Sequence, residues 1–224
     1  MTNFLIRLRS ENGQIKDLAN NPWKNSGVTA TSDGLYFNGS SYLDFEVSSS
    51  IAKVIKSGSN FTYSAWYYQE ESSQYSAAIF QIIDILLLFI KNPENNGYGG
   101  IATTTQWKIY NISENLNQYG KWTHIAIVRY NNIITLYLNG RSIGLATDWM
   151  AGDIKVTRCA IGYLYHSSSN SKFKGWVQDL FFLNDKALWT SNFTPPPIFY
   201  ALNNTLWNFK NNMYGYKNLK YVKS

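Results

Sequence analysis

Residues 120–145, GKWTHIAIVRYNNIITLYLNGRSIGL, constrain the fold of this chain more than any other segment. They contain three short runs rich in β-branched and aromatic residues, separated by the pairs Asn131-Asn132 and Asn139-Gly140. Two-residue connections of this composition are typical of tight hairpin turns, because Asn and Gly accept the positive φ angles that such turns require. The segment therefore predicts a meander of three antiparallel strands.

The two turns also predict which side chains share a face of this meander. Side chains alternate along a strand, so pairing across the turns sorts them into two sets. One face is aliphatic and comprises Ile125, Ile127, Ile134, Leu136, Leu138, Ile143 and Leu145. The other is aromatic and partly polar, and comprises Trp122, His124, Val128, Tyr130, Thr135 and Tyr137. We expect the first face to be core.

The rest of the chain continues this pattern of short strands. Only 15% of the 224 residues are charged, whereas 45% are hydrophobic, and no long amphipathic helix period is present. Further strands bounded by turns are expected within residues 33–45, 61–70, 77–90, 101–112, 157–164 and 173–183. More than ten short strands without βαβ alternation predict an all-β fold, a two-sheet antiparallel sandwich of the jelly-roll kind.

The segment 77–90, AAIFQIIDILLLFI, is the most apolar run, and it predicts two buried strands with a turn near Asp84. It is too short to span a bilayer and carries a charge in its middle, so we expect no membrane insertion. Near the N-terminus, Arg7, Arg9 and Glu11 interrupt the apolar run that a secretory signal needs, so we expect no signal peptide. Cys159 is the only cysteine, which excludes an internal disulfide.

The run Pro195-Pro196-Pro197 cannot join a central strand and predicts the end of the sandwich. We therefore divide the chain into a sandwich, residues 1–197, and an extension, residues 198–224. The extension is basic and aromatic, and its aromatic residues include Trp207, Phe209, Tyr214, Tyr216 and Tyr221. This mixture suits docking onto a neighbouring protein, and stacking on nucleic acid bases is the alternative. Nucleic acid is the less favoured partner, because the other cations of this chain of net charge +6 are mostly scattered.

Five segments resemble the concanavalin A-like lectin/glucanase superfamily, in its laminin G-like branch. They are DGLYFNGSSYLDF at 33–45, FTYSAWYYQ at 61–69, GKWTHIAIVRY at 120–130, ITLYLNGRSIG at 134–144 and FKGWVQDLFFLNDKALW at 173–189. The resemblance implies a concanavalin A-like jelly roll over residues 33–197. It says little about activity, because this fold hosts enzymes, lectins and structural modules.

The closing sequence ALWTSNFTPP, residues 187–196, resembles in particular the ending of such domains in bacteriophage tail and capsid proteins and in proteins of other large viruses. This resemblance implies a virion component that is assembled in the host cytoplasm. Its partners would be other virion proteins or sister subunits.

Catalytic chemistry is not indicated. Glucanases that the chain resembles carry three acids on one strand, whereas Asp44 and Glu46 stand here without a third. Asp179 stands alone at a position where the family often has an acid for structural reasons. His124 lacks a recognisable nucleophile and orienting carboxylate, and two His with one Cys do not make a zinc site. We expect a protein that is not an enzyme.

A calcium site is the one cofactor that the resemblance brings into consideration. Laminin G-like domains often bind calcium through loop oxygens, and Asp148 and Asp153 in TDWMAGD are the candidate ligands. Met150 and Ala151 between them supply no side-chain oxygen, so we expect no cofactor.

The remaining candidate site is the aromatic face of the meander, with Trp122, His124, Tyr130 and Tyr137. Such rings suit stacking on a sugar or packing at a protein interface, unless a loop covers them as ordinary core. The sequence thus predicts a virion component, a phage tail, fibre or capsid-decoration protein, that acts by protein contact and by contact with host-surface glycans. A soluble carbohydrate-binding module is the alternative, and a glycan hydrolase is the third hypothesis.

Overall fold

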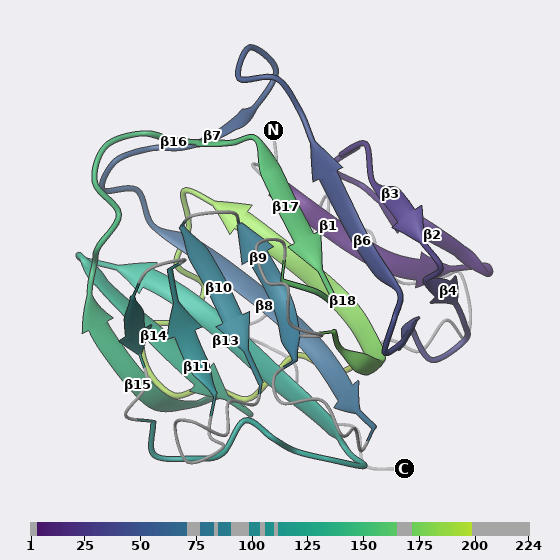
Figure 1. Ribbon diagram of the computed structural model, residues 1–224. Helices are drawn as coiled ribbons and strands as arrows, with labels where there is room; N and C mark the ends of the chain where they lie inside the picture. Colours follow the sequence, from purple (N-terminus) through teal and green to yellow (C-terminus); the bar gives the residue numbers. More distant parts are fainter. Residues whose placement is uncertain are drawn as a thin grey trace.

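Two antiparallel sheets lie face to face in the computed structural model (Figure 1). The structure describes residues 4–70, 77–82, 85–90, 99–103, 106–109, 112–164 and 172–198. Within these ranges every regular element is a strand, and no helix is long and apolar enough to cross a membrane. The all-β sandwich predicted from the sequence is confirmed.

The sheet that contains the meander, called the meander sheet below, has the order β15-β14-β13-β8-β18-β1-β2, with β5 joined to β18 and β4 to β5. Its strands are β1 (Phe4–Glu11), β2 (Gln14–Asp17), β4 (Thr29–Ala30), β5 (Leu35–Asn38), β8 (Phe61–Gln69), β13 (Trp122–Tyr130), β14 (Ile133–Leu138), β15 (Arg141–Thr147) and β18 (Lys174–Asn184).

The opposing sheet has the order β12-β11-β10-β9-β17-β6-β3. Its strands are β3 (Lys24–Ser26), β6 (Tyr42–Glu46), β9 (Ala78–Ile82), β10 (Leu86–Phe89), β11 (Gly100–Ala102), β12 (Trp107–Ile109) and β17 (Arg158–Ile161). A separate pair joins β7 (Lys53–Ile55) to β16 (Ile154–Val156). One continuous core of buried aliphatic and aromatic side chains fills the space between the two large sheets.

The meander forms as predicted. Both residues of each turn have positive φ, 48° and 62° at Asn131 and Asn132, and 48° and 78° at Asn139 and Gly140. Pairing across the first turn sets Ile125 opposite Leu138 and Ile127 opposite Leu136. The aliphatic side of the meander is buried between the sheets.

Leu145 is the exception to the predicted register. Tyr137 pairs with Ser142, but the next residue, Leu136, pairs with Gly144, so β15 carries one extra residue at Ile143. Such a bulge reverses the faces of the residues that follow it. Ile143 points into the core, and Leu145 lies on the outer face with 65% of its surface exposed. The expectation that Leu145 belongs to the aliphatic face was wrong for this reason.

The strands expected within residues 33–45 are present as β5 and β6, but these two strands do not pair with each other. β5 pairs with β18 in the meander sheet, whereas β6 pairs with β17 in the opposing sheet. The connection at Gly39 therefore passes from one sheet to the other. The apolar run 77–90 supplies β9 and β10 as an antiparallel pair, and its predicted turn residue Asp84 lies outside the described residues.

Candidate functional site

The segment that follows β18, residues 185–198, crosses the outer face of the meander sheet and is called the covering segment below. Thr62 ties its start, since the Thr62 hydroxyl donates to Lys186 O and accepts from Leu188 N, both at 2.9 Å. Its middle is held at the second hairpin turn, where Phe193 N donates to Gly140 O at 2.9 Å. The covering segment therefore hides one half of the aromatic face.

His124 and Tyr137 lie under this segment, with 0% and 3% of their surfaces exposed. The Phe193 ring makes edge contacts with both, at centroid distances of 5.7 Å to His124 and 5.3 Å to Tyr137. His124 Nε2 lies 2.9 Å from Ser64 Oγ, and burial lowers the pKa of this imidazole to about 3. The structure thus places these two predicted site residues in a covered core, the alternative that the sequence left open.

Trp122 is the first residue of β13 and lies in the half of the aromatic face where a cleft opens. The cleft has a volume of about 630 Å³ and is lined by Asp33, Tyr68, Glu70, Tyr119, Gly120, Trp122 and Trp176. Four of these seven lining residues are aromatic and two are carboxylates. The composition suits a ligand that has apolar faces and hydrogen-bonding edges.

Four aromatic residues at this end of the sheet stand in one cross-strand row. Trp122 on β13 is opposite Tyr68 on β8, Tyr68 is opposite Trp176 on β18, and Trp176 is opposite Tyr36 on β5. Because neighbouring strands lie about 4.8 Å apart, the row extends about 14 Å across the sheet. The ring of Tyr68 meets Trp122 at 5.9 Å and Trp176 at 5.5 Å, both edge to face. The arrangement is a fixed aromatic platform.

Gly175 brings β18 close enough to β8 to form this row. A Cβ atom at Gly175 would lie 2.0 Å from the carbonyl oxygen of Tyr68, and the residue has a φ of +135°. The loop before β13 is fixed in the same region, because Gly120 N donates to Gln69 O at 3.0 Å and Tyr119 forms a bridge with Gln69. Backbone contacts therefore hold both the platform and the loop that borders it.

Glu70 is the most organised polar group of the cleft. Its Oε2 accepts from Lys174 Nζ at 3.1 Å and from the Tyr36 hydroxyl at 3.4 Å. These two contacts fix the carboxylate beside the aromatic row. Asp33, in contrast, is exposed in the turn before β5, and its backbone N donates to Thr31 Oγ1 at 3.2 Å.

Tyr130 is exposed, with 42% of its surface accessible, at the end of β13 remote from Trp122. Of the four predicted site residues, Trp122 alone lines the cleft. Sequence reasoning did not single out Trp176 or Tyr36. The signal for them was present only as aromatic residues in two of the resembling segments, and their juxtaposition depends on pairing between strands far apart in the chain.

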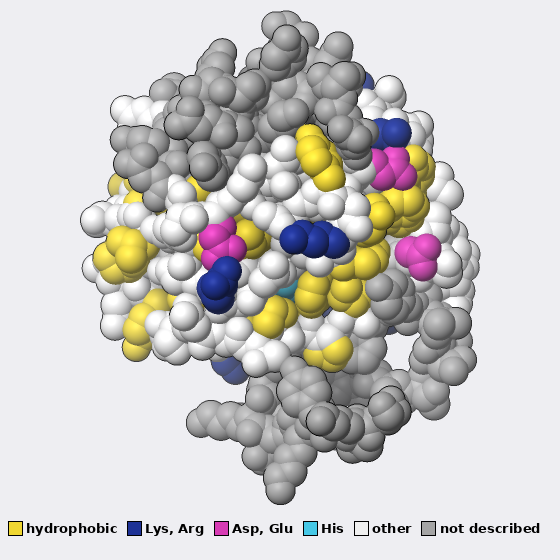
Figure 2. Space-filling view, turned by 90° about the horizontal axis from the view of Figure 1, so that it is seen from below, with side chains coloured by type: hydrophobic (Ala, Val, Ile, Leu, Met, Phe, Trp, Pro, Cys, Tyr) yellow, Lys and Arg dark blue, Asp and Glu magenta, His cyan; other side chains and the backbone are white. Residues whose placement is uncertain are grey.

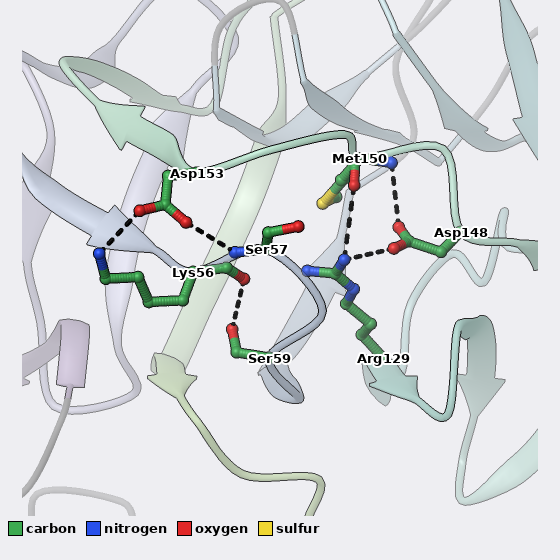
Figure 3. Close-up of polar contacts among 7 residues, drawn as sticks. All are labelled: Lys56, Ser57, Ser59, Arg129, Asp148, Met150 and Asp153. Atoms are coloured by element: carbon green, nitrogen blue, oxygen red, sulfur yellow. Dashed lines mark hydrogen bonds and ion pairs between the residues drawn. The ribbon is translucent and has the colours of Figure 1, made fainter.

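The two candidate calcium ligands are engaged by different cations (Figure 3). Asp148 forms an ion pair with Arg129 and accepts from Met150 N at 3.0 Å. Asp153 pairs with Lys56 at 2.7 Å and accepts from Ser57 N, and these bonds lower the pKa of its carboxyl. The two carboxylates therefore belong to separate networks, and in the described part of the chain no cluster of three or more His, Cys, Asp or Glu side chains could hold a metal ion.

The two acids compared above with the glucanase pattern lie away from the cleft. Asp44 and Glu46 alternate with buried Leu43 and Phe45 on β6, so they face outward from the opposing sheet. Glu46 forms an ion pair with Arg158. Asp179 stands at a bulge of β18 with a φ of +51°, a backbone position consistent with a structural role.

The predicted docking residues Trp207, Phe209, Tyr214, Tyr216 and Tyr221 lie outside the described residues. On the face seen in Figure 2, cationic and acidic side chains of the described residues are interspersed around apolar ones. Such a distribution does not favour a phosphate backbone as a partner of that face.

Comparison with known proteins decides the family. The model of the concanavalin A-like lectin/glucanases superfamily, of laminin G type, matches residues 37–189. The chain belongs to this superfamily. No curated protein sequence matches it.

Solved structures of the same fold include three proteins with carbohydrate-related or binding functions. Domain 4 of the extracellular arabinanase AbnA from Geobacillus stearothermophilus, in complex with arabinotriose, has a TM-score of 0.58 and 16% identity, covering 82% of this chain and 93% of that domain. Trypanosoma rangeli sialidase in complex with sialic acid has a TM-score of 0.57 and 13% identity, and the match covers 83% of this chain and 31% of the sialidase chain. The binding domain of botulinum neurotoxin serotype G has a TM-score of 0.54 and 13% identity, and the match covers 83% of this chain and 48% of the toxin domain. This chain therefore spans about a third of the sialidase and about half of the toxin domain, and the similarity concerns the fold.

Proposed function

We propose that this protein is a non-enzymatic carbohydrate-binding module whose glycan lies in the cleft at Trp122. The observation that carries the proposal is the row of Trp122, Tyr68 and Trp176 at the cleft, beside a covering segment that buries His124 and Tyr137 on the same face. Aromatic rings with fixed orientation and an adjacent carboxylate supply the stacking and hydrogen bonding that a sugar uses. The arabinotriose bound in the structure of AbnA domain 4 supports a sugar as the class of ligand.

Two ring deletions test the site. Trp122→Ala is expected to weaken binding of the best ligand on a glycan array by at least about tenfold, which corresponds to the loss of one well-packed aromatic contact. Tyr130→Ala is the matched control, because it removes an exposed ring from the other end of the same strand. Equal loss of binding in both variants, or no binding by the unmodified protein across a broad array, contradicts the proposal.

The proposal that the protein is not an enzyme rests on the placement of its acids. Asp44 and Glu46 are on the outer face of the opposing sheet, and Glu70 in the cleft is paired with Lys174. We expect no release of reducing sugar from any glycan that the protein binds. Release that disappears in Glu70→Gln would instead favour the hydrolase hypothesis.

A virion location is the second part of the proposal, and the resemblance of residues 187–196 to the ends of phage and large-virus domains supports it. In this setting the cleft would take host-surface glycans, and residues 198–224 would dock the module to other virion proteins or sister subunits. Deletion of residues 201–224 is expected to abolish incorporation into particles while the sandwich stays folded. Normal incorporation of the truncated protein contradicts the docking role.

A further inference from the structure

The charged side chains among the described residues that line the cleft are of one sign. The described lining residues include Asp33 and Glu70 and no Lys or Arg. Lys174 lies beside the cleft, where its ammonium pairs with the Glu70 carboxylate, and this contact raises the pKa of Lys174. Lys121, next to Gly120, is exposed at the surface. A ligand in the cleft therefore meets the carboxylate of Asp33 and that of Glu70, whose negative charge Lys174 offsets in part.

The two carboxylates also define the hydrogen-bonding character of the cleft. An ionised carboxylate only accepts hydrogen bonds, so its partner must be a donor such as a sugar hydroxyl. The two contacts that the Glu70 carboxylate makes with described residues both use Oε2. The Tyr68 and Tyr119 hydroxyls can donate or accept, so they do not reverse this preference.

An acidic sugar would face side chains with the same charge as its own carboxylate. Its own carboxylate is an acceptor with a negative charge, and it would lie in a cleft whose charged side chains are also acceptors. Like charges that face one another across an interface weaken binding strongly, and in this way they reject wrong ligands. The ring faces of a neutral sugar, in contrast, can stack on Trp122 or Trp176 while its hydroxyls donate to the carboxylates.

We infer that Asp33 and Glu70 restrict this cleft to sugars without a negative charge, and that they act as specificity-determining residues. This inference rests on the proposed glycan function of the same cleft. The inferred preference for neutral sugars differs from the ligand of one structural neighbour, the Trypanosoma rangeli sialidase solved in complex with sialic acid.

The test compares matched sugars on the full chain. Neutral oligosaccharides and the same oligosaccharides carrying one sialic or uronic acid, for example lactose and 3′-sialyllactose, are ranked on an array. The best pair is then titrated by tryptophan fluorescence. The neutral member is expected to bind about tenfold more tightly or better. Preference for the acidic member, or equal affinity, overturns the inference but leaves the glycan function standing.

Substitutions that remove the two charges test whether Asp33 and Glu70 cause the preference for neutral sugars. Asp33→Asn/Glu70→Gln is expected to bring the ratio of the neutral-sugar to the acidic-sugar affinity to about one or below, because the repulsion is lost and the Lys174 ammonium no longer has its carboxylate partner. Asp44→Asn/Glu46→Gln makes the same change in net charge on the opposite face of the sandwich and is expected to leave the ratio unchanged. An unchanged ratio in the first variant overturns the inference. Absence of binding to every member of the array overturns the proposed function and the inference with it.

Discussion

The ring of Phe193 lies flat on the ring of Trp189, with centroids 4.0 Å apart and planes 4° from parallel. This stacked pair is the central part of the covering segment, and both rings reach the buried His124 from above. The pair therefore decides that the Tyr137 half of the aromatic face is core. The Trp122 half is the part that borders the cleft.

Gly140→Ala is expected to displace the covering segment. An added Cβ would lie 1.8 Å from the Phe193 carbonyl oxygen, and the φ of +78° adds strain. We expect a loss of unfolding free energy of about 2–4 kcal/mol, in the range of other steric and backbone defects. Gly13→Ala is the control measured by chemical denaturation, because Gly13 has a similar φ of +70° but open space around it. Similar losses in the two variants would show that the covering segment is not packed against the turn.

His124 is expected to make the fold sensitive to mild acid. Its pKa in the folded protein is about 3, below the value of about 6.5 in the unfolded chain, so the unfolded state binds more protons below pH 6.5. The contribution of neutral His124 to the free energy of unfolding is therefore fully present above pH 6.5. It is lost as the pH drops from there towards 3, by up to about 1.4 kcal/mol per pH unit. The measurement is urea unfolding between pH 7 and 5, where most carboxylates stay ionised.

The comparison for this pH effect uses a His166→Gln background, in which His124 is the sole histidine. Adding His124→Gln is expected to remove most of the pH slope in that interval, even though the variant is less stable at pH 7. A slope that persists after the substitution would assign the acid sensitivity to other groups.

Asp148→Ala is expected to destabilise the protein far more than Asp153→Ala. The Asp148 and Arg129 side chains are only 9% and 2% exposed, so removing the carboxylate leaves a buried guanidinium without its counter-charge. Breaking such a buried pair costs about 3–5 kcal/mol. The pair of Asp153 and Lys56 is exposed and screened by solvent, so its loss is expected to have little effect on stability. Thermal or denaturant unfolding of the two variants gives the comparison directly, and losses of equal size would contradict it.

The bulge in β15 predicts opposite outcomes for two aliphatic residues that are two positions apart. Ile143→Ala removes a buried side chain and is expected to cost about 2–4 kcal/mol. Leu145→Ala alters an exposed side chain and is expected to change stability by less than about 0.5 kcal/mol. A large loss for Leu145→Ala would mean that the strand follows the regular alternation instead.

The local architecture follows from the residues of each short segment. The Asn and Gly residues at 131–132 and 139–140 specify turns with positive φ, and alternation then assigns Ile125, Ile127 and Leu136 to the core, because both effects act within a few residues. The candidate site, in contrast, depends on contacts between residues far apart in the chain. Phe193 covers His124, which lies some seventy positions earlier in the chain, and Trp176 and Tyr36 complete a row that begins at Trp122. No periodicity encodes such contacts, since they arise only when strands far apart in the chain pair and a later segment packs across them.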